Sequence, residues 1–257
     1  MADLRLEPER YAAAIVTLAT AIGDVALHAA RRISVIIPFL DEEIALPATL
    51  AALLPQLDAA RGDEVIAVDG GSRDGSCRVL AGHAAVRLVV APRGRASQMN
   101  AGARAASGDV LLFLHADTLL PDGALAAIAN AAAGPEFVYG GFHHRFSGDD
   151  RRLQLISALH NFRCARTQTF YGDQALFVAR AAFHRAGGFP LQQVEDIALS
   201  EVLRAQGPPA FLPLTVVTDA RKFVRAGVWR SFARVLAILV CLRIGLPLPQ
   251  AFFADVR

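Results

Sequence analysis

The sequence is poor in cysteine and has no marked excess of either charge. Its 257 residues include three cysteines, Cys77, Cys164 and Cys241, which lie far apart and form no C-x-x-C pair. This spacing excludes a disulfide framework and a cysteine zinc site, and it is typical of a reduced cytosolic chain. Basic and acidic residues nearly balance, and the formal net charge is +2. The chain therefore lacks the excess of positive charge that is typical of nucleic-acid-binding domains.

The sequence also lacks a long, uncharged apolar run. Its most apolar stretch near the C-terminus, residues 232–248, carries Arg234 and Arg243. That stretch is too short and too charged to span a bilayer, so we expect a C-terminal helical segment over 227–257. This segment has two interpretations: a helix packed against the protein, or a helix that lies on a membrane surface. The first ten residues lack the positive region of a signal peptide, and we expect a helical extension over 1–32.

Apolar residues make up 54% of the chain, which is enough to bury a sizeable core. From residue 33 onward, strand-like runs alternate with helical stretches. The runs are ISVIIPF, EVIAVD, VRLVV and DVLLFLHAD. This rhythm predicts a single α/β domain with a mostly parallel central sheet and helices on both of its faces.

Each of these strands ends in a loop that carries polar or charged residues. Because the carboxyl ends of parallel strands form the ligand crevice of an open α/β sheet, we expect the loops to converge on one cleft. The dinucleotide pattern G-x-G-x-x-G is absent, which argues against that class of cofactor. The loop residues of interest are Asp41, Glu42, Asp69, Gly71, Ser72, Asp74, Arg93, Arg95, His115 and Asp117.

Asp117 ends an apolar run, and an unpaired charge there would be costly. It either caps the following turn or binds Mg²⁺ or Mn²⁺, which prefer carboxylate oxygen. His115 lies two residues earlier, on the same side of an extended segment, as a ligand or a hydrogen-bonding neighbour. Asp69 has the same two interpretations, a turn residue or a hydrogen bond to a nucleotide base or ribose.

Glu195 and Asp196 begin a predicted helix. Acidic residues at a helix N-terminus complement its dipole, which is the structural interpretation. The functional interpretation is general base catalysis, in which a carboxylate removes a proton from an attacking hydroxyl.

Five segments in a fixed order resemble the family 2 glycosyltransferases, which have the GT-A fold. They are SVIIPFLDEE, EVIAVDGGSRDGS, RGRASQMNAGARAASGDVLLFLHAD, YGDQALFV and VEDIALSEVLR. The resemblance covers about residues 33–226 and implies a nucleotide-binding half over 33–120 and an acceptor half over 121–226. It is nearest to a compact bacterial subgroup associated with radical-SAM or selenium-domain genes and with arsenosugar biosynthesis.

The resemblance also implies roles for single residues. Asp117 would hold the metal and the diphosphate, with His115 in the place of the first acid of the D-x-D motif. Asp196 would be the catalytic base, beside Glu195. The residues implied beside the nucleotide are Pro38, Asp41, Glu42, Asp69, Gly71, Ser72, Asp74, Arg93, Gln98 and Asn100. Those implied on the acceptor side are Gly172, Asp173 and Gln174, and those implied near the diphosphate are Arg221 and Lys222.

The implied activity is that of a metal-dependent, inverting glycosyltransferase of the hexosyltransferase type. It would move a sugar from a nucleotide-diphosphate donor to a small-molecule or lipid acceptor. The Q-x-x-R-W motif of processive synthases is absent, so the expected enzyme is non-processive and cytoplasmic, with peripheral contact at the inner membrane face as an option. The alternative function is a catalytically silent nucleotide-sugar-binding protein, because His115 weakens the metal motif.

Two other enzyme classes fit the sequence poorly. A phosphatase of the D-x-D-G-T type would need its nucleophilic carboxylate at position 115, which is His115. A sugar-nucleotide pyrophosphorylase would need a Gly-rich loop with basic residues after the first strand, where this chain has the acidic FLDEE.

Overall fold

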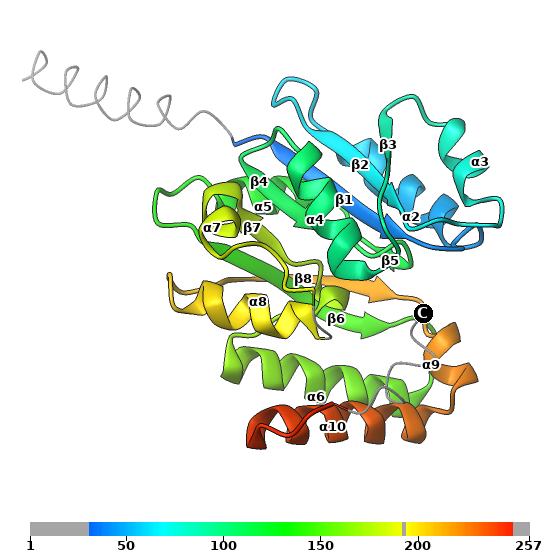
Figure 1. The fold of residues 1–257 in the computed structure, drawn as a ribbon, viewed down its shortest axis with the longest axis vertical. Helices are drawn as coiled ribbons and strands as arrows, with labels where there is room; N and C mark the ends of the chain where they lie inside the picture. The colour runs from blue at the N-terminus through cyan, green and yellow to red at the C-terminus, as the bar shows by residue number, and fades with distance from the viewer. Residues whose placement is uncertain (1–30, 192–193, 249–257) are drawn as a thin grey trace, which may run out of the picture.

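The computed structural model describes residues 31–191 and 194–248, shown in colour in Figure 1. The helical extension expected over 1–32 therefore lies almost wholly outside the described residues. The same holds for residues 249–257 of the expected C-terminal segment.

The first half of the described chain alternates strands and helices, as the sequence predicted. Its strands are β1 (Ile33–Phe39), β2 (Glu64–Asp69), β3 (Val86–Val90) and β4 (Val110–Phe113). Its helices are α2 (Leu46–Leu53), the short η1 (Leu54–Gln56), α3 (Ser76–Ala81) and α4 (Arg95–Ala105). The four strands are mutually parallel in the order β3-β2-β1-β4, so the loops after β1, β2 and β4 meet at one edge.

The second half completes the sheet with a mixture of strand directions. Its strands are β5 (Thr118–Leu119), β6 (Tyr139–Phe146), β7 (Phe177–Ala179) and β8 (Ala210–Thr218). Its helices are α5 (Ala124–Ala131), α6 (Arg151–Thr167), η2 (Gly172–Gln174), α7 (Arg180–Arg185), α8 (Glu195–Arg204), α9 (Arg221–Arg225) and α10 (Val228–Ile244). Within the described residues the sheet has eight strands in the order β3-β2-β1-β4-β7-β6-β8-β5. β7 runs antiparallel to β4 and β6, and β6 and β8 are parallel.

Helices cover both faces of this sheet, so the predicted α/β class is confirmed (Figure 1). Val35 and Ile37 of β1 face the core shared with α2 and α5, whereas Ile36 faces the core shared with α4, α7 and α8. α4 packs very close to the strands, because a Cβ added to Gly102 would lie 2.4 Å from Ile36 Cγ2. Only glycine permits that approach.

α10 packs beside α6 rather than on the sheet (Figure 1). Leu153, Ile156 and Val228 form a small apolar cluster between these helices and α9. Among the described residues, none of the helices combines the length and the apolar character needed to cross a membrane.

The segment around Asp117 differs from the expectation. β4 ends at Phe113, and the Thr118 N–H donates to the His115 carbonyl at 3.0 Å, which closes a turn. The chain turns because Thr118 and Leu119 form an antiparallel pair with β8, far along the sequence. The prediction that His115 and Asp117 lie on the same side of one extended segment is therefore wrong.

Candidate active site

The rim of the expected crevice is built from the loops after β1 and β2, which hydrogen-bond to each other. The Asp41 N–H donates to Ser72 Oγ at 3.0 Å, and the Arg73 N–H donates to Asp41 Oδ1 at 2.7 Å. The Glu43 N–H donates to Asp74 Oδ2 at 3.0 Å. Three predicted nucleotide-binding residues, Asp41, Ser72 and Asp74, thus hold the rim in shape through these contacts.

Asp69 lies at the carboxyl end of β2, where the sequence predicted it. Its side chain is buried, and Oδ1 accepts both the N–H and the O–H of Ser72, at 2.8 and 2.6 Å. Gly71 has φ +93°, a conformation that favours glycine and lets the loop fold back over Asp69. Asp69 is therefore fixed in orientation next to the rim.

Gln98 and Asn100 lie on α4, and both amides bind backbone groups. Gln98 Nε2 donates to the carbonyls of Phe39 and Val68, at 2.7 and 2.9 Å, and so ties together the ends of β1 and β2. Asn100 exchanges two hydrogen bonds with the backbone of Phe189. These contacts are structural, and the nucleotide-binding role of both residues stays a prediction.

The other two predicted nucleotide-side residues lie on either side of this region. Pro38 is in β1, paired in register with Val68 of β2. Arg93 is exposed, just before the start of α4.

Asp117 and Glu42 converge on one cation, Lys222 of α9. Lys222 Nζ lies 3.3 Å from Asp117 Oδ2 and forms a shorter ion pair with Glu42 Oε1. Burial raises the pKa of Glu42, although Lys222 acts against this shift. Two carboxylates that share one positive charge form a donor set that suits a hard divalent cation. Arg221, by contrast, binds Asp219 through Nε at 2.5 Å.

Asp196 is the most perturbed acid of the site. Its Oδ2 accepts the Gly172 N–H at 2.9 Å, while its Oδ1 is buried without a hydrogen-bond partner. Burial, and then the charge of Glu195, raise the pKa of Asp196 to about 7. The Nε of Arg95 lies 3.9 Å from Glu195 Oε1. A carboxyl group poised near neutral pH with a free oxygen is suited to general base catalysis.

His115 lies beside Asp196, and Gly172 is between them. A Cβ added to Gly172 would lie 2.3 Å from His115 Nε2 and 2.7 Å from Asp196 Oδ2. His115 Nε2 is buried without a hydrogen-bond partner. Burial, and then Arg95, lower the pKa of His115 to about 4, so its imidazole is neutral at pH 7. The charges of Asp117, Asp173 and Lys222 also act on the pKa of His115. His115 therefore lies within electrostatic range of both Asp117 with Lys222 and Asp173.

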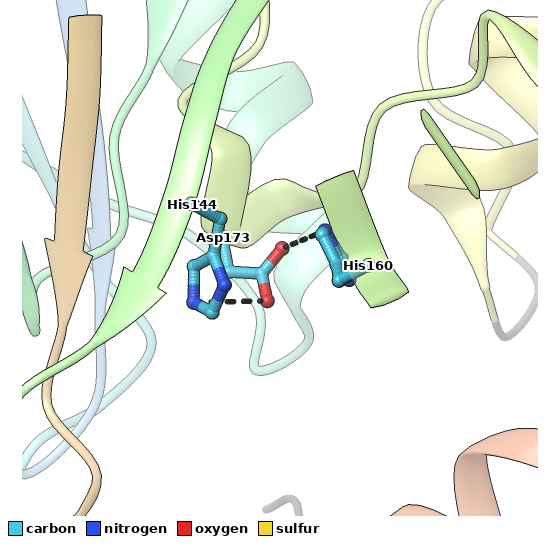
Figure 2. Close-up of side chains that lie close together, drawn as sticks. All are labelled: His144, His160 and Asp173. Atoms are coloured by element: carbon cyan, nitrogen blue, oxygen red, sulfur yellow. Dashed lines mark ion pairs between the residues drawn. The ribbon is translucent and has the colours of Figure 1, made fainter. Parts of the chain in front are cut away.

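The predicted acceptor segment Gly172–Gln174 forms η2. Gln174 is fully buried; its Oε1 accepts the Tyr171 N–H and its Nε2 donates to the Phe142 carbonyl, both at 3.2 Å. Asp173 turns its carboxylate toward two imidazoles, those of His144 and His160 (Figure 2). An acceptor-binding role for Asp173 and Gln174 stays a prediction.

Sequence reasoning missed His144 and His160. The only local signal was the pair of histidines in FHHRFS, inside a segment expected to be a strand. Although burial alone would raise it, the pKa of Asp173 is lowered to about 2 by His160 and then His144. Asp173 is thus ionised over the whole physiological range.

The α/β fold thus brings the acid pair at the start of α8 and the carboxylates of Asp117 and Glu42 into one candidate enzyme site. The model of the family described as Glycosyl transferase family 2 matches residues 34–190, more than half of the chain. The chain therefore belongs to glycosyl transferase family 2.

Two curated relatives match parts of the chain. One is the undecaprenyl-phosphate 4-deoxy-4-formamido-L-arabinose transferase of Aeromonas hydrophila, 33% identical over 108 residues, which cover 39% of this chain and 33% of that protein. Another is an uncharacterized glycosyltransferase of Mycobacterium bovis, 34% identical over 110 residues, which cover 42% of this chain and 47% of that protein. The chain thus matches less than half of the length of either relative.

Solved structures share the fold at low sequence identity. The mannosyltransferase PcManGT from Pyrobaculum calidifontis, in complex with GDP-Man and Mn²⁺, has a TM-score of 0.62 and 22% identity, over 94% of this chain and 78% of that chain. TarS 1-349 from S. aureus, in complex with UDP-GlcNAc, has a TM-score of 0.59 and 18% identity, over 74% of this chain and 59% of that chain. These similarities confirm the predicted GT-A fold.

We expect Gly172→Ala to destabilise the protein through its overlap with His115 and Asp196. Overpacking of a buried site costs about 1–3 kcal/mol, measurable by urea unfolding. Adding His115→Ala should remove one clash and recover part of the loss. Gly134→Ala is the control, because nothing lies within 4 Å of a Cβ at Gly134. Equal stability of Gly172→Ala and wild type would contradict the close approach.

We expect Asp196→Asn to gain stability relative to wild type as the pH rises. Folding raises the pKa of Asp196 from 3.8 to about 7. The protonated carboxyl group therefore contributes to stability at low pH, and this contribution is lost as the pH rises from the unfolded pKa to the folded one. The Tm difference, variant minus wild type, should be larger at pH 8 than at pH 5, by about 2–4 °C per kcal/mol. Glu201→Gln, at an exposed acid of α8, is the control. A difference that does not change with pH would refute the raised pKa.

Proposed function

We propose that this chain is a metal-dependent, inverting, non-processive glycosyltransferase of the hexosyltransferase type. It moves a sugar from a nucleotide-diphosphate donor to an acceptor hydroxyl. The observation that carries the proposal is Asp196, a buried carboxyl group with one unpaired oxygen and a raised pKa, close to the cation site of Asp117. Family membership supports the reaction class.

The donor would lie over the carboxyl ends of β1, β2 and β4. The rim formed by Asp41, Ser72 and Asp74 and the fixed carboxylate of Asp69 border that position, near Arg93 at the start of α4. PcManGT and TarS, which share the fold, were solved with GDP-Man and UDP-GlcNAc, and this supports a nucleotide sugar as the donor.

Mg²⁺ or Mn²⁺ would bind at Asp117, with Glu42 beside it; His115, the other predicted ligand, would have to rotate toward Asp117, because the chain turns between these two residues. When bound, the metal neutralises the charge that develops on the diphosphate leaving group. Lys222 already contacts both carboxylates, so its ammonium group lies within reach of the same phosphates. Arg221 precedes it on α9 and adds a second positive charge nearby.

Asp196 performs the proton transfer. Its free Oδ1 accepts the proton of the acceptor hydroxyl, while the Gly172 N–H holds Oδ2 in place. Arg95 and Glu195 set the charge around it. A single displacement of the nucleotide diphosphate by this hydroxyl inverts the anomeric carbon.

The acceptor would be a small molecule or a lipid, and the protein cytoplasmic with peripheral contact at the inner membrane face. Trp229, Val240 and Ile244 of α10 are exposed apolar residues, next to the exposed Arg230 and Arg243. The name of the Aeromonas relative, an undecaprenyl-phosphate transferase, supports a lipid acceptor. Membership of the radical-SAM and arsenosugar subgroup stays a prediction.

We expect one nucleoside diphosphate to raise the Tm of the wild type only when a divalent metal is present. A ligand at about 100 times its Kd adds about 2.7 kcal/mol. The measurement is a thermal-shift panel of UDP, GDP, CDP, TDP and ADP, each with and without Mn²⁺. Asp117→Ala should lose the shift, whereas Asp122→Ala, at an exposed acid five residues away, should keep it. Failure of every nucleotide to shift the wild type would remove the donor site.

We expect Asp196→Asn to bind the same nucleotide as the wild type but to lose sugar transfer. Loss of a general base costs about 10²–10⁴-fold in rate. The assay follows release of the nucleoside diphosphate from the matching sugar donor, with cell extract as the source of acceptor. Glu201→Gln should transfer at the wild-type rate. Unchanged release in Asp196→Asn would remove Asp196 from the mechanism, and a wild type that binds donor without release would favour the silent binding protein.

A further inference from the structure

A cluster of side chains with the chemistry of metal ligands lies next to the candidate active site, because Asp173 directly follows Gly172. His144 of β6, His160 of α6 and Asp173 of η2 each offer one ligand atom, and these atoms all lie within 4.8 Å of one another. Figure 2 shows the Asp173 carboxylate between the two imidazole rings. The three residues come from separate segments, so the fold and not the local sequence brings them together.

We propose that His144, His160 and Asp173 form a transition-metal site of the zinc type, distinct from the cation site at Asp117. The donor set carries this distinction, because two imidazoles and one carboxylate suit Zn²⁺ and related ions. The carboxylates of Asp117 and Glu42 instead suit Mg²⁺ or Mn²⁺. The proposal does not depend on glycosyl transfer.

The polar atoms of the cluster lack partners of their own. Both ring nitrogens of His144, Nε2 of His160 and Oδ1 of Asp173 are buried without a hydrogen bond. The hydroxyl of Tyr171, whose ring centroid is 5.0 Å from that of His160, is also buried without a partner. Buried polar atoms are rarely left unpaired, so their concentration here points to a bound group.

The separations fit ligands around an ion better than hydrogen bonds between side chains. His144 Nε2 lies 3.6 Å from Asp173 Oδ2, and His160 Nε2 lies 3.5 Å from Asp173 Oδ1. A direct hydrogen bond would bring such atoms to about 2.7–3.2 Å. The three ligand atoms, one from each residue, lie within 4.8 Å of one another. Ligands at about 2.0–2.1 Å from a tetrahedral Zn²⁺ lie roughly 3.3–3.4 Å apart, so the side chains must close around the ion by up to about 1.4 Å.

An ion can reach the cluster from solvent. The side chain of His144 is 1% exposed, but those of His160 and Asp173 are 13% and 26% exposed. Three protein ligands leave a fourth position for water or a substrate oxygen. Asp173 follows Gly172, whose N–H holds Asp196, so the metal would fix the backbone that positions the candidate base.

The test is Co²⁺ binding to the full-length, metal-free protein, followed by visible absorption and then displacement by Zn²⁺. We expect the visible bands of a four-coordinate site to reach their maximum at one Co²⁺ per chain. His144→Ala and His160→Gln should weaken Co²⁺ binding more than about 100-fold, because each removes a ligand. His143→Ala is the matched control, since His143 directly precedes His144 in β6 and its ring centroid lies 4.3 Å from that of Phe211.

Asp117→Ala separates this proposal from the proposed function. That variant should keep the cobalt bands while it loses the nucleotide-dependent thermal shift. Circular dichroism and Tm without metal establish that each variant is folded; the less buried position of His160 keeps the test open if His144→Ala does not fold. A wild type without cobalt bands, or bands that survive in His160→Gln, would overturn the metal site in favour of a metal-free His–Asp–His cluster.

Discussion

The hydrogen bond from the Gly172 N–H to Asp196 Oδ2 is the contact on which the candidate site depends. It joins η2 to the start of α8 at 2.9 Å, and it can form because no Cβ separates the backbone of Gly172 from His115 and Asp196. The Gly172 N–H satisfies Oδ2 of Asp196, whereas Oδ1 stays buried without a hydrogen-bond partner. A single N–H lowers the pKa of Asp196 less than burial and Glu195 raise it. The geometry therefore yields an acid that changes protonation near pH 7, rather than one ionised throughout.

Asp173 and Asp196 show how the surroundings of two neighbouring acids give them opposite pKa shifts. Asp196 faces Glu195 and one backbone N–H, and its pKa rises to about 7. Asp173 faces His160 and His144, and its pKa falls to about 2. The first acid can exchange a proton at neutral pH, whereas the second keeps a constant negative charge. Paired titratable groups with opposite shifts are a common sign of divided function, and here the opposite shifts agree with the proton transfer proposed for Asp196 and the cation binding proposed for Asp173.

The sequence predicted the parallel half of the fold well, because each strand there is a short apolar run next to its own crossover helix. It predicted the loops at the strand ends for the same reason, and Asp69 and Asp196 lie where expected.

The turn between His115 and Asp117 was not predictable, since it depends on pairing between β5 and β8, which lie about a hundred residues apart in the chain. His144 and His160 were missed because their meeting with Asp173 requires three distant segments. The hydrogen bonds of Gln98 to the carbonyls of Phe39 and Val68 were not predictable either, because a sequence does not show which buried amide ties two strand ends together.

Lys222 connects the cation site to the second half of the chain. Its ammonium group balances Glu42 and Asp117, whose charges would otherwise repel each other. The divalent cation proposed at Asp117 would have to compete with this ion pair. α9 leads directly into α10, which packs on α6, the helix that carries His160. The same short helix thus holds Lys222 against Glu42 and Asp117 and leads along the chain into α10, which carries exposed apolar residues.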